Sequence, residues 1–137
     1  MRTLTPLSTP LQPTQRSKMT QAIPKQINIK MGSGCLELIY EEGPAYELSF
    51  EFLRVLSPSA EVRGHGEGNE VLQFGKKFVT IKQVEPAGNY AIKITFSDHH
   101  DSGLYSWPLL YKFCKEKDSL WQAYLDKLNA AGQSREP

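Results

Sequence analysis

The stretch VEPAGNYAIKITFSDHHDSGLYSWPLLY, residues Val84–Tyr111, decides the fold of this 137-residue chain. Its segment Asn89–Phe96 is rich in β-branched and aromatic residues, which favour strands. Phe78–Val84, just before it, has a similar composition. The residues PAGN at 86–89 lie between the two segments and are typical of a turn. We therefore predict two antiparallel strands joined by this turn.

The residues that follow predict a third strand and two helices. Gly103–Tyr105 is a short predicted strand, and Ser106 is the predicted N-cap of a helix that runs to Lys115. Asp118 or Ser119 is predicted to cap the last helix. One apolar stripe runs along that helix with helical spacing, formed by Trp121, Tyr124, Leu125 and Leu128. We expect the stripe to pack on the sheet, and the alternative is a partner-binding groove.

The first half of the chain predicts a hairpin and a further strand. Gln26–Met31 and Cys35–Tyr40 alternate polar and apolar residues, which is the pattern of half-buried strands. A glycine-containing turn separates them, so the pair is predicted to be a β-hairpin. Ala45–Leu48 adds a short predicted strand after Gly43-Pro44 breaks the chain.

Serine residues predict two short helices in the same half. Ser49 is a predicted N-cap, and Ser57 followed by Pro58 predicts a second helix start whose short helix stops at Gly64. All these elements together predict an α+β fold. In it, a small, mostly antiparallel sheet packs against the C-terminal helices, with short helices in the first half.

One domain, residues 22–130, is predicted to lie between two tails. Residues 1–21 are rich in proline and threonine and hold few large apolar groups, which predicts a disordered N-terminal tail. Residues 131–137 are predicted to be a flexible C-terminal tail. Met19 is an alternative to Met1 as the start of the chain.

Composition excludes several classes of function. Sixteen basic and fifteen acidic residues leave a net charge of +1, so we expect no nucleic-acid partner and no attraction to an anionic membrane. No apolar run reaches the roughly 18–20 residues that cross a bilayer, and no signal peptide is recognised. Cys35 and Cys114 are far apart and are predicted to be reduced thiols of a cytoplasmic protein.

The run Asp98-His99-His100-Asp101 concentrates the side chains that could bind a metal. His99 and Asp101 match half of the iron-binding motif of non-haem oxygenases, which also needs a distal histidine. No histidine follows His100, so the motif is incomplete. As a turn between strands the run needs no function, because Asp and Ser stabilise turns. We expect no cofactor, and we keep iron or zinc at this turn as the alternative.

The remaining chemical motifs point to no catalytic residue. The loop GHGEG at 64–68 lacks the last glycine of a dinucleotide fingerprint, and Gly75-Lys76-Lys77 lacks the hydroxyl of a P-loop. Cys114 lies on the apolar side of its predicted helix, where burial raises a thiol pKa. No GxSxG elbow is present.

A dense set of short runs resembles a known family across Pro24–Cys114. The runs are LRV at 53–55, SPSAEV at 57–62, GHG at 64–66, VEPxGNY at 84–90 and DSGLYSW at 101–107. They resemble the DUF971 domain, which is the N-terminal domain of gamma-butyrobetaine hydroxylase and its relatives, in its free-standing bacterial form. The resemblance implies a small α+β unit. The oxygenase domain of those hydroxylases is absent, so their activity is not implied.

The resemblance also implies which residues of this chain occupy the zinc-ligand positions of the family. In the hydroxylases the domain holds a structural zinc with three cysteines and one histidine. The cysteine positions fall here on Ser57, Ser59 and Val62, and the histidine on His100. Serine and valine do not replace thiolates, so we expect no structural zinc of that kind.

The leading functional hypothesis is a non-enzymatic accessory or protein-interaction module. A similar domain is fused to P-loop ATPases that handle iron–sulfur clusters, which suggests a connection with metallocofactor assembly. Polar loop residues on a rigid scaffold often carry binding, so we predict a contact surface for a protein partner from His65, Glu67, His99, His100, Asp101 and Tyr105. The alternative is a metal-binding protein or minor oxidoreductase that uses the His99, His100 and Asp101 turn.

Overall fold

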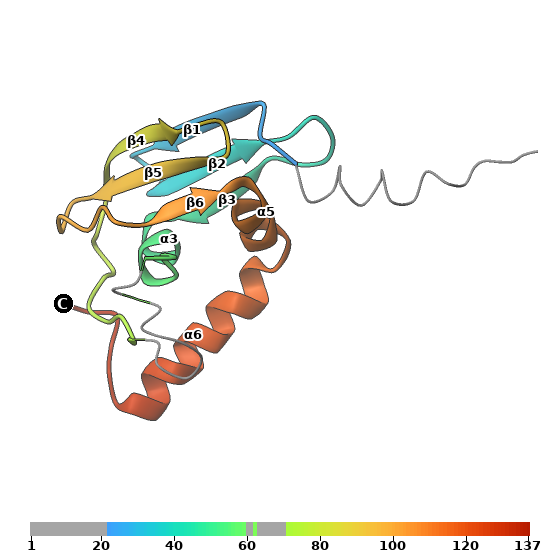
Figure 1. Ribbon diagram of the computed structural model, residues 1–137. Coiled ribbons are helices and arrows are strands. Elements are labelled where there is room, and N and C mark those ends of the chain that lie inside the picture. The colour runs from blue at the N-terminus through green and yellow to red at the C-terminus, as the bar shows by residue number, and fades with distance from the viewer. Residues whose placement is uncertain (1–21, 60–61, 63–70) are drawn as a thin grey trace, which may run out of the picture.

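A computed structural model describes residues 22–59, 62 and 71–137 of the chain. The predicted N-terminal tail lies outside these residues, and so do His65, Glu67 and most of the short helix predicted after Ser57. In Figure 1 two small sheets lie on one side of the molecule, and helices cover the other side. The α+β class predicted from the sequence is confirmed, with two three-stranded sheets in place of one.

The first sheet has the strand order β1-β2-β3 and is antiparallel throughout. Its strands are β1 (Gln26–Lys30), β2 (Cys35–Ile39) and β3 (Tyr46–Ser49). The predicted hairpin is therefore confirmed, and Gly34 adopts the positive φ of 68° that its turn requires.

The second sheet has the order β4-β5-β6 and is also antiparallel. Its strands are β4 (Ile81–Ala87), β5 (Ala91–Phe96) and β6 (Leu104–Ser106). The predicted boundary of β4 was wrong by three residues, because Pro86 belongs to the strand and not to the turn. An edge strand tolerates a proline, which has no N–H to donate to a ladder. Gly88, with a φ of 58°, begins the turn instead.

Helix α3 (Phe50–Val55) is short and buried along its whole length. Ser49 caps it as predicted, and its Oγ accepts a hydrogen bond from the Phe52 backbone N–H at 3.0 Å. Figure 1 shows α3 between the sheets and the last helix. Burial on all sides forces the charged Glu51 and Arg54 of α3 to find partners inside the fold.

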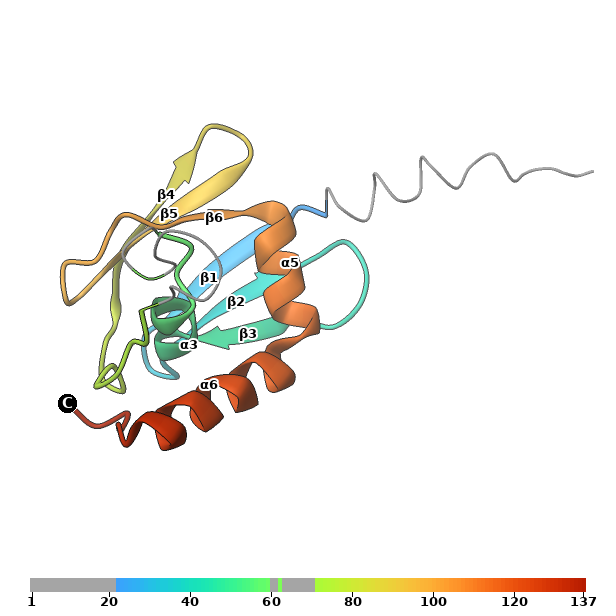
Figure 2. The ribbon, with the colours of Figure 1, turned by 60° about the horizontal axis from the view of Figure 1, so that its bottom comes forward.

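One hydrophobic core joins the two sheets to α3 and to helix α5 (Trp107–Lys115). Residues of β2, β5, α3 and α5 are buried together in it, among them Leu36, Ile94, Phe52 and Phe113. Ser106 caps α5 as predicted, with its Oγ accepting from the Leu109 N–H. In Figure 2, α5 runs from the end of β6 towards the last helix.

Helix α6 (Lys117–Ala131) begins differently from the prediction and packs only partly as predicted. Glu116 precedes it without a side-chain cap, so neither Asp118 nor Ser119 has the predicted capping role. Tyr124 and Leu128 of the apolar stripe are buried against Val55 of α3, not against a sheet. Trp121 of the stripe packs instead against the main core, which holds residues of both sheets, so the stripe packs partly on the sheet side, as predicted, and partly on α3. None of the helices in the described ranges is long and apolar enough to cross a membrane.

The C-terminal residues make fixed contacts where the sequence predicted a flexible tail. The Gly75 N–H donates to the Ser134 carbonyl at 2.9 Å, and the Lys77 N–H donates to the Arg135 carbonyl at 3.1 Å. The Arg135 guanidinium binds both carboxylate oxygens of Glu51. This pairing satisfies a carboxylate on α3 that is only 5% exposed, which explains why the tail is held.

Candidate functional site

A buried cluster of two serines and a histidine joins the end of α3 to the turn after β5. His100 Nε2 lies 2.9 Å from Ser57 Oγ and 3.3 Å from Ser59 Oγ. All three residues are buried, with Ser57 only 1% exposed. The resemblance predicted that these residues correspond to positions of one zinc site, and the structure brings them together. Val62, the fourth position, is also buried, and its N–H donates to the Ser59 carbonyl.

Local backbone geometry directs His100 into the cluster. His99 adopts a φ of 72°, a conformation that few non-glycine residues adopt. The His100 N–H donates to Asp98 Oδ1, and the His100 carbonyl accepts from the Phe96 N–H, so the turn folds back on β5. Gly103 lies so close that an added Cβ would be 2.4 Å from Ser57 Oγ. A side chain at this position would therefore force Ser57 to shift.

The donor set of this cluster does not fit zinc. Two neutral hydroxyls and a valine accompany the imidazole, and none of the three is the thiolate that structural zinc sites of this kind use. No group of three metal-ligating side chains occurs anywhere in the described ranges. Hydrogen bonds between the serines and His100 now link the two segments of the chain.

The Ser57–His100 contact also lacks the setting that nucleophilic catalysis needs. A nucleophile must reach a substrate, but Ser57 is enclosed. The His100 ring nitrogen that would act as a base faces Ser59 as well as Ser57. The arrangement is therefore a structural polar cluster.

An ion network centred on Asp98 lies next to this cluster. Asp98 Oδ2 is 2.9 Å from Arg54 Nε and 2.8 Å from Lys76 Nζ. Arg54 also donates to Gln73. Burial disfavours the charged carboxylate, but the hydrogen bonds and charges of Lys76 and Arg54 outweigh it and lower the pKa of Asp98 to about 2. The network connects α3 to the turn that carries His100.

The fold exposes some residues of the predicted contact surface and buries others. His99 and Asp101 are exposed, and Asp101 lies 4.0 Å from Lys93 in a weak ion pair. His100 points inwards, and Tyr105 is fully buried with its hydroxyl donating to the Leu53 carbonyl at 2.6 Å. A buried side chain cannot contact a partner, so the prediction was wrong for His100 and Tyr105. The side chains of the histidine turn also do not converge on one point.

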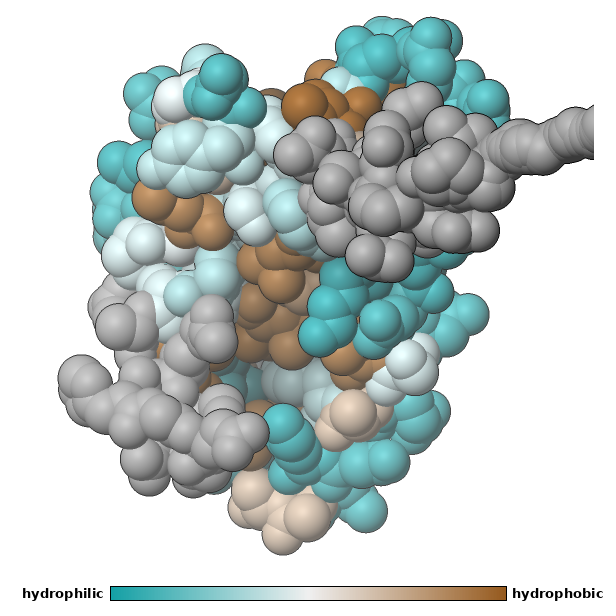
Figure 3. All heavy atoms as spheres, turned by 45° about the vertical axis from the view of Figure 1, so that its right-hand side comes forward, coloured by the Kyte–Doolittle hydropathy of each residue, from teal (hydrophilic) through white to brown (hydrophobic). Residues whose placement is uncertain are grey.

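An apolar groove opens beside the buried cluster, between the end of α3 and the helices α5 and α6. Its volume is about 430 Å³. The lining comes mostly from aliphatic and aromatic side chains, including Val55, Leu56, Leu109, Phe113 and Leu120. Figure 3 shows hydrophobic residues gathered in a hollow on this side of the molecule.

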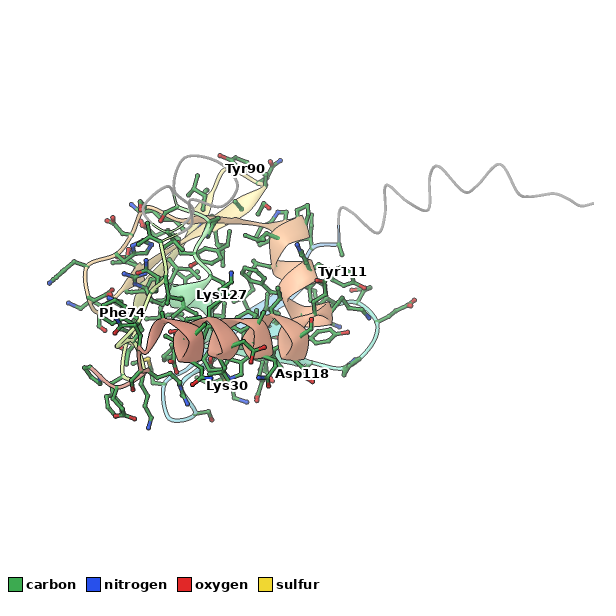
Figure 4. The ribbon with its side chains drawn as sticks, turned by 90° about the horizontal axis from the view of Figure 1, so that it is seen from below. Lys30, Phe74, Tyr90, Tyr111, Asp118 and Lys127 are labelled. Atoms are coloured by element: carbon green, nitrogen blue, oxygen red, sulfur yellow. The ribbon has the colours of Figure 1, made fainter. Side chains whose placement is uncertain are left out.

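Two lysines add positive charge to the groove. Lys112 on α5 and Lys127 on α6 line it and are exposed. Figure 4 shows Lys127 along α6, well past Asp118 at the start of that helix. No Asp or Glu occurs among the described lining residues. The sequence left a partner-binding groove at the α6 stripe as the alternative. It gave no role to Leu109, Lys112 and Phe113 of α5, which also line the groove.

The fold and the site define a class of small α+β proteins with two antiparallel sheets, an enclosed serine–histidine cluster and an apolar groove. The chain belongs to the family described as gamma-butyrobetaine hydroxylase-like, N-terminal, whose model matches residues 12–111. The match begins before Pro24, where the quoted resemblance starts. No curated protein matches the chain.

Three solved structures are similar to this one. A protein studied by NMR in solution is 52% identical with a TM-score of 0.76, covering 85% of this chain and 92% of that one. A second NMR structure is 43% identical with a TM-score of 0.73, covering 98% and 92%. A crystal structure of a DUF971 protein of unknown function from Acidithiobacillus ferrooxidans is 33% identical with a TM-score of 0.55, covering 69% and 92%. These likenesses support the family and the fold.

Proposed function

We propose that this protein is a non-enzymatic accessory module that binds a partner protein through the groove between α3, α5 and α6. The observation that carries the proposal is the open apolar lining of the groove. A volume of about 430 Å³ falls within the range of pockets that bind ligands. Apolar surface left open on one face of a small domain is typical of an interaction site.

The state of the reactive side chains supports a non-enzymatic role. Burial raises the pKa of the Cys114 thiol to about 11 and also raises that of Cys35, so little reactive thiolate forms at neutral pH. The Ser57 hydroxyl and the His100 ring bind each other inside the fold. The two thiols, Ser57 and His100 are thus all buried.

We propose metallocofactor assembly as the setting in which to look for the partner, and the cytoplasm as the compartment. The first proposal rests on the similarity to a domain that is fused to ATPases of iron–sulfur clusters. The second is supported by the two free cysteines, because disulfides are rare in reducing compartments.

A site-specific photo-crosslinker tests the groove as the contact surface. The crosslinking residue replaces Ala123, an exposed residue of α6 that lines the groove. The matched control replaces Asn129, an exposed residue of the same helix outside the lining. We expect a defined protein adduct, identified by mass spectrometry in the producing cells, from position 123 only. Equal adducts from both positions, or none from position 123, would overturn the proposal.

A further inference from the structure

We infer that the groove receives an acidic amphipathic helix of the partner protein. In this arrangement apolar side chains of the helix enter the groove and its carboxylates pair with Lys112 and Lys127. The inference rests on the proposed function, because it names the chemistry of the segment that the same groove binds.

The architecture of the groove favours a helix over an extended strand. Two of its walls, α5 and α6, are helices whose backbone groups are hydrogen-bonded within each helix. A peptide that binds as a β-strand pairs its N–H and C=O groups with a free sheet edge, which neither α5 nor α6 provides. A helix satisfies these groups internally and contributes only side chains. Helical ligands of this kind place apolar anchors at spacings of i, i+3 or i+4, and i+7.

The positive charges of the groove favour a ligand with negative charge. Neither Lys112 nor Lys127 forms an ion pair with any residue that the structure describes, whereas Lys30, Lys76 and Arg135 each bind a carboxylate. The described lining contributes no negative charge to balance the two lysines. Complementary charges at the edge of an apolar site mainly set specificity and the rate of association. The geometry therefore points to carboxylates that flank the apolar anchors.

By the same criterion of charge complementarity, the N-terminal segment of this chain does not suit the groove. Residues 1–21 carry Arg2, Arg16 and Lys18 and no Asp or Glu. Their charge has the same sign as that of the two groove lysines. The prolines of this segment also oppose a continuous helix.

Titrations of the full-length protein with two synthetic helical peptides test the inference. Each peptide is about 16 residues long, a length at which an isolated helix begins to be stable. Both carry leucines along one face, flanked by glutamates in one peptide and by lysines in the other. We expect the glutamate peptide to bind about tenfold more tightly at low salt, since the two groove lysines attract its exposed carboxylates weakly and repel the lysine peptide. Backbone NMR shifts should change at Leu109, Lys112, Ala123 and Lys127.

Charge reversal in the protein provides the matched control. The Lys112→Glu/Lys127→Glu variant should prefer the lysine peptide. The Lys82→Glu/Lys115→Glu variant changes the net charge equally, outside the groove lining, and should keep the preference for the glutamate peptide. A third peptide, in which serines replace the leucines, should not bind.

Each contrary result identifies what has failed. Equal binding of both leucine peptides in the groove would overturn the charge assignment and leave the proposed function intact. Shifts confined to other surfaces, or no binding of either peptide, would overturn the acidic helix. If position 123 also forms no crosslinked adduct, the proposed function fails as well.

Discussion

The buried serine–histidine cluster and the groove beside it share Ser57, yet the fold uses their polar groups in opposite ways. In the cluster, His100 and two serines are enclosed and bonded to one another. In the groove, Lys112 and Lys127 are exposed without a carboxylate in the described lining. The cluster joins distant segments of the fold, whereas the groove leaves its two lysines exposed, which is the arrangement that the proposed partner helix requires.

Restoring thiolates should turn the enclosed cluster into a metal site, which is the largest effect we expect. The Ser57→Cys/Ser59→Cys/Val62→Cys variant combines three thiols with His100. A tetrahedral zinc separates a sulfur and a nitrogen ligand by about 3.5 Å, and the present Oγ–Nε2 distances of 2.9 and 3.3 Å are close to this value. We expect one bound zinc per chain by metal analysis, and a Tm at least about 5 °C higher with zinc than with a chelator.

The same three substitutions with His100→Ala serve as the control and should bind zinc much more weakly. The natural chain should keep its Tm in the presence of a chelator. A triple-cysteine variant that folds but ignores zinc would show that these four positions do not converge.

Adding one methyl group beside Ser57 should destabilise the cluster. A Cβ at Gly103 would lie 2.4 Å from Ser57 Oγ and 3.2 Å from Pro58 Cδ. Gly103→Ala is therefore expected to lower the free energy of unfolding by about 3 kcal/mol, the upper range for overpacked cores. Urea denaturation measures the change. Gly32→Ala is the matched control, because no atom lies within 4 Å of the added Cβ. Equal stability of the two variants would contradict the close packing at Ser57.

Acid should weaken the ion network that supports the cluster. The pKa of Asp98 is about 2 in the fold, lowered from 3.8. Its contribution to stability is therefore complete above about pH 4 and falls as the pH drops towards 2. We expect Asp98→Asn to cost about 1–2 kcal/mol at neutral pH, because solvent partly screens this carboxylate.

Urea denaturation between about pH 2 and 6 tests this dependence. The difference between the natural chain and Asp98→Asn should shrink as the pH falls. Asp101→Asn is the control and should change little, since Asp101 is exposed and 4.0 Å from Lys93. A difference that stays constant with pH would rule out ionised Asp98 as its cause.

Reversing the groove charges should have the smallest effect on stability. Lys112→Glu/Lys127→Glu removes no ion pair among the described residues, so the free energy of unfolding should change by less than about 0.5 kcal/mol. Thermal and urea denaturation provide the measurement. A loss as large as that of Asp98→Asn would mean that the fold itself uses these lysines, and the contrast between the two regions would disappear.

Local signals predicted most of the elements. The alternation around the turn at Gly34 specified the first hairpin, and the hydroxyls of Ser49 and Ser106 marked two helix starts that the structure confirms. These features depend on neighbouring residues, so a single sequence reveals them. The prediction was wrong at Pro86, where the residue type indicated a turn. The edge position of β4 accommodates this proline within the strand.

The sites depended on contacts that no local pattern contains. Residue types alone could not tell that His100 faces inwards while His99 faces solvent, or that Tyr105 donates to Leu53 across 52 positions of the chain. The resemblance to a family brought Ser57, Ser59 and His100 into one hypothesis. Periodicity could not have done so, because 43 residues separate Ser57 from His100.

By itself, the sequence determined the α+β class and the family, because the elements follow from residue types and their spacing, and the short runs between 53 and 107 carry the family resemblance. Only the tertiary structure decided that α6 packs on α3, that Arg135 anchors the C-terminus on Glu51, and that a groove opens between α5 and α6. Packing between distant elements sets these features. It depends on which surfaces of the described residues fill the core and which stay exposed.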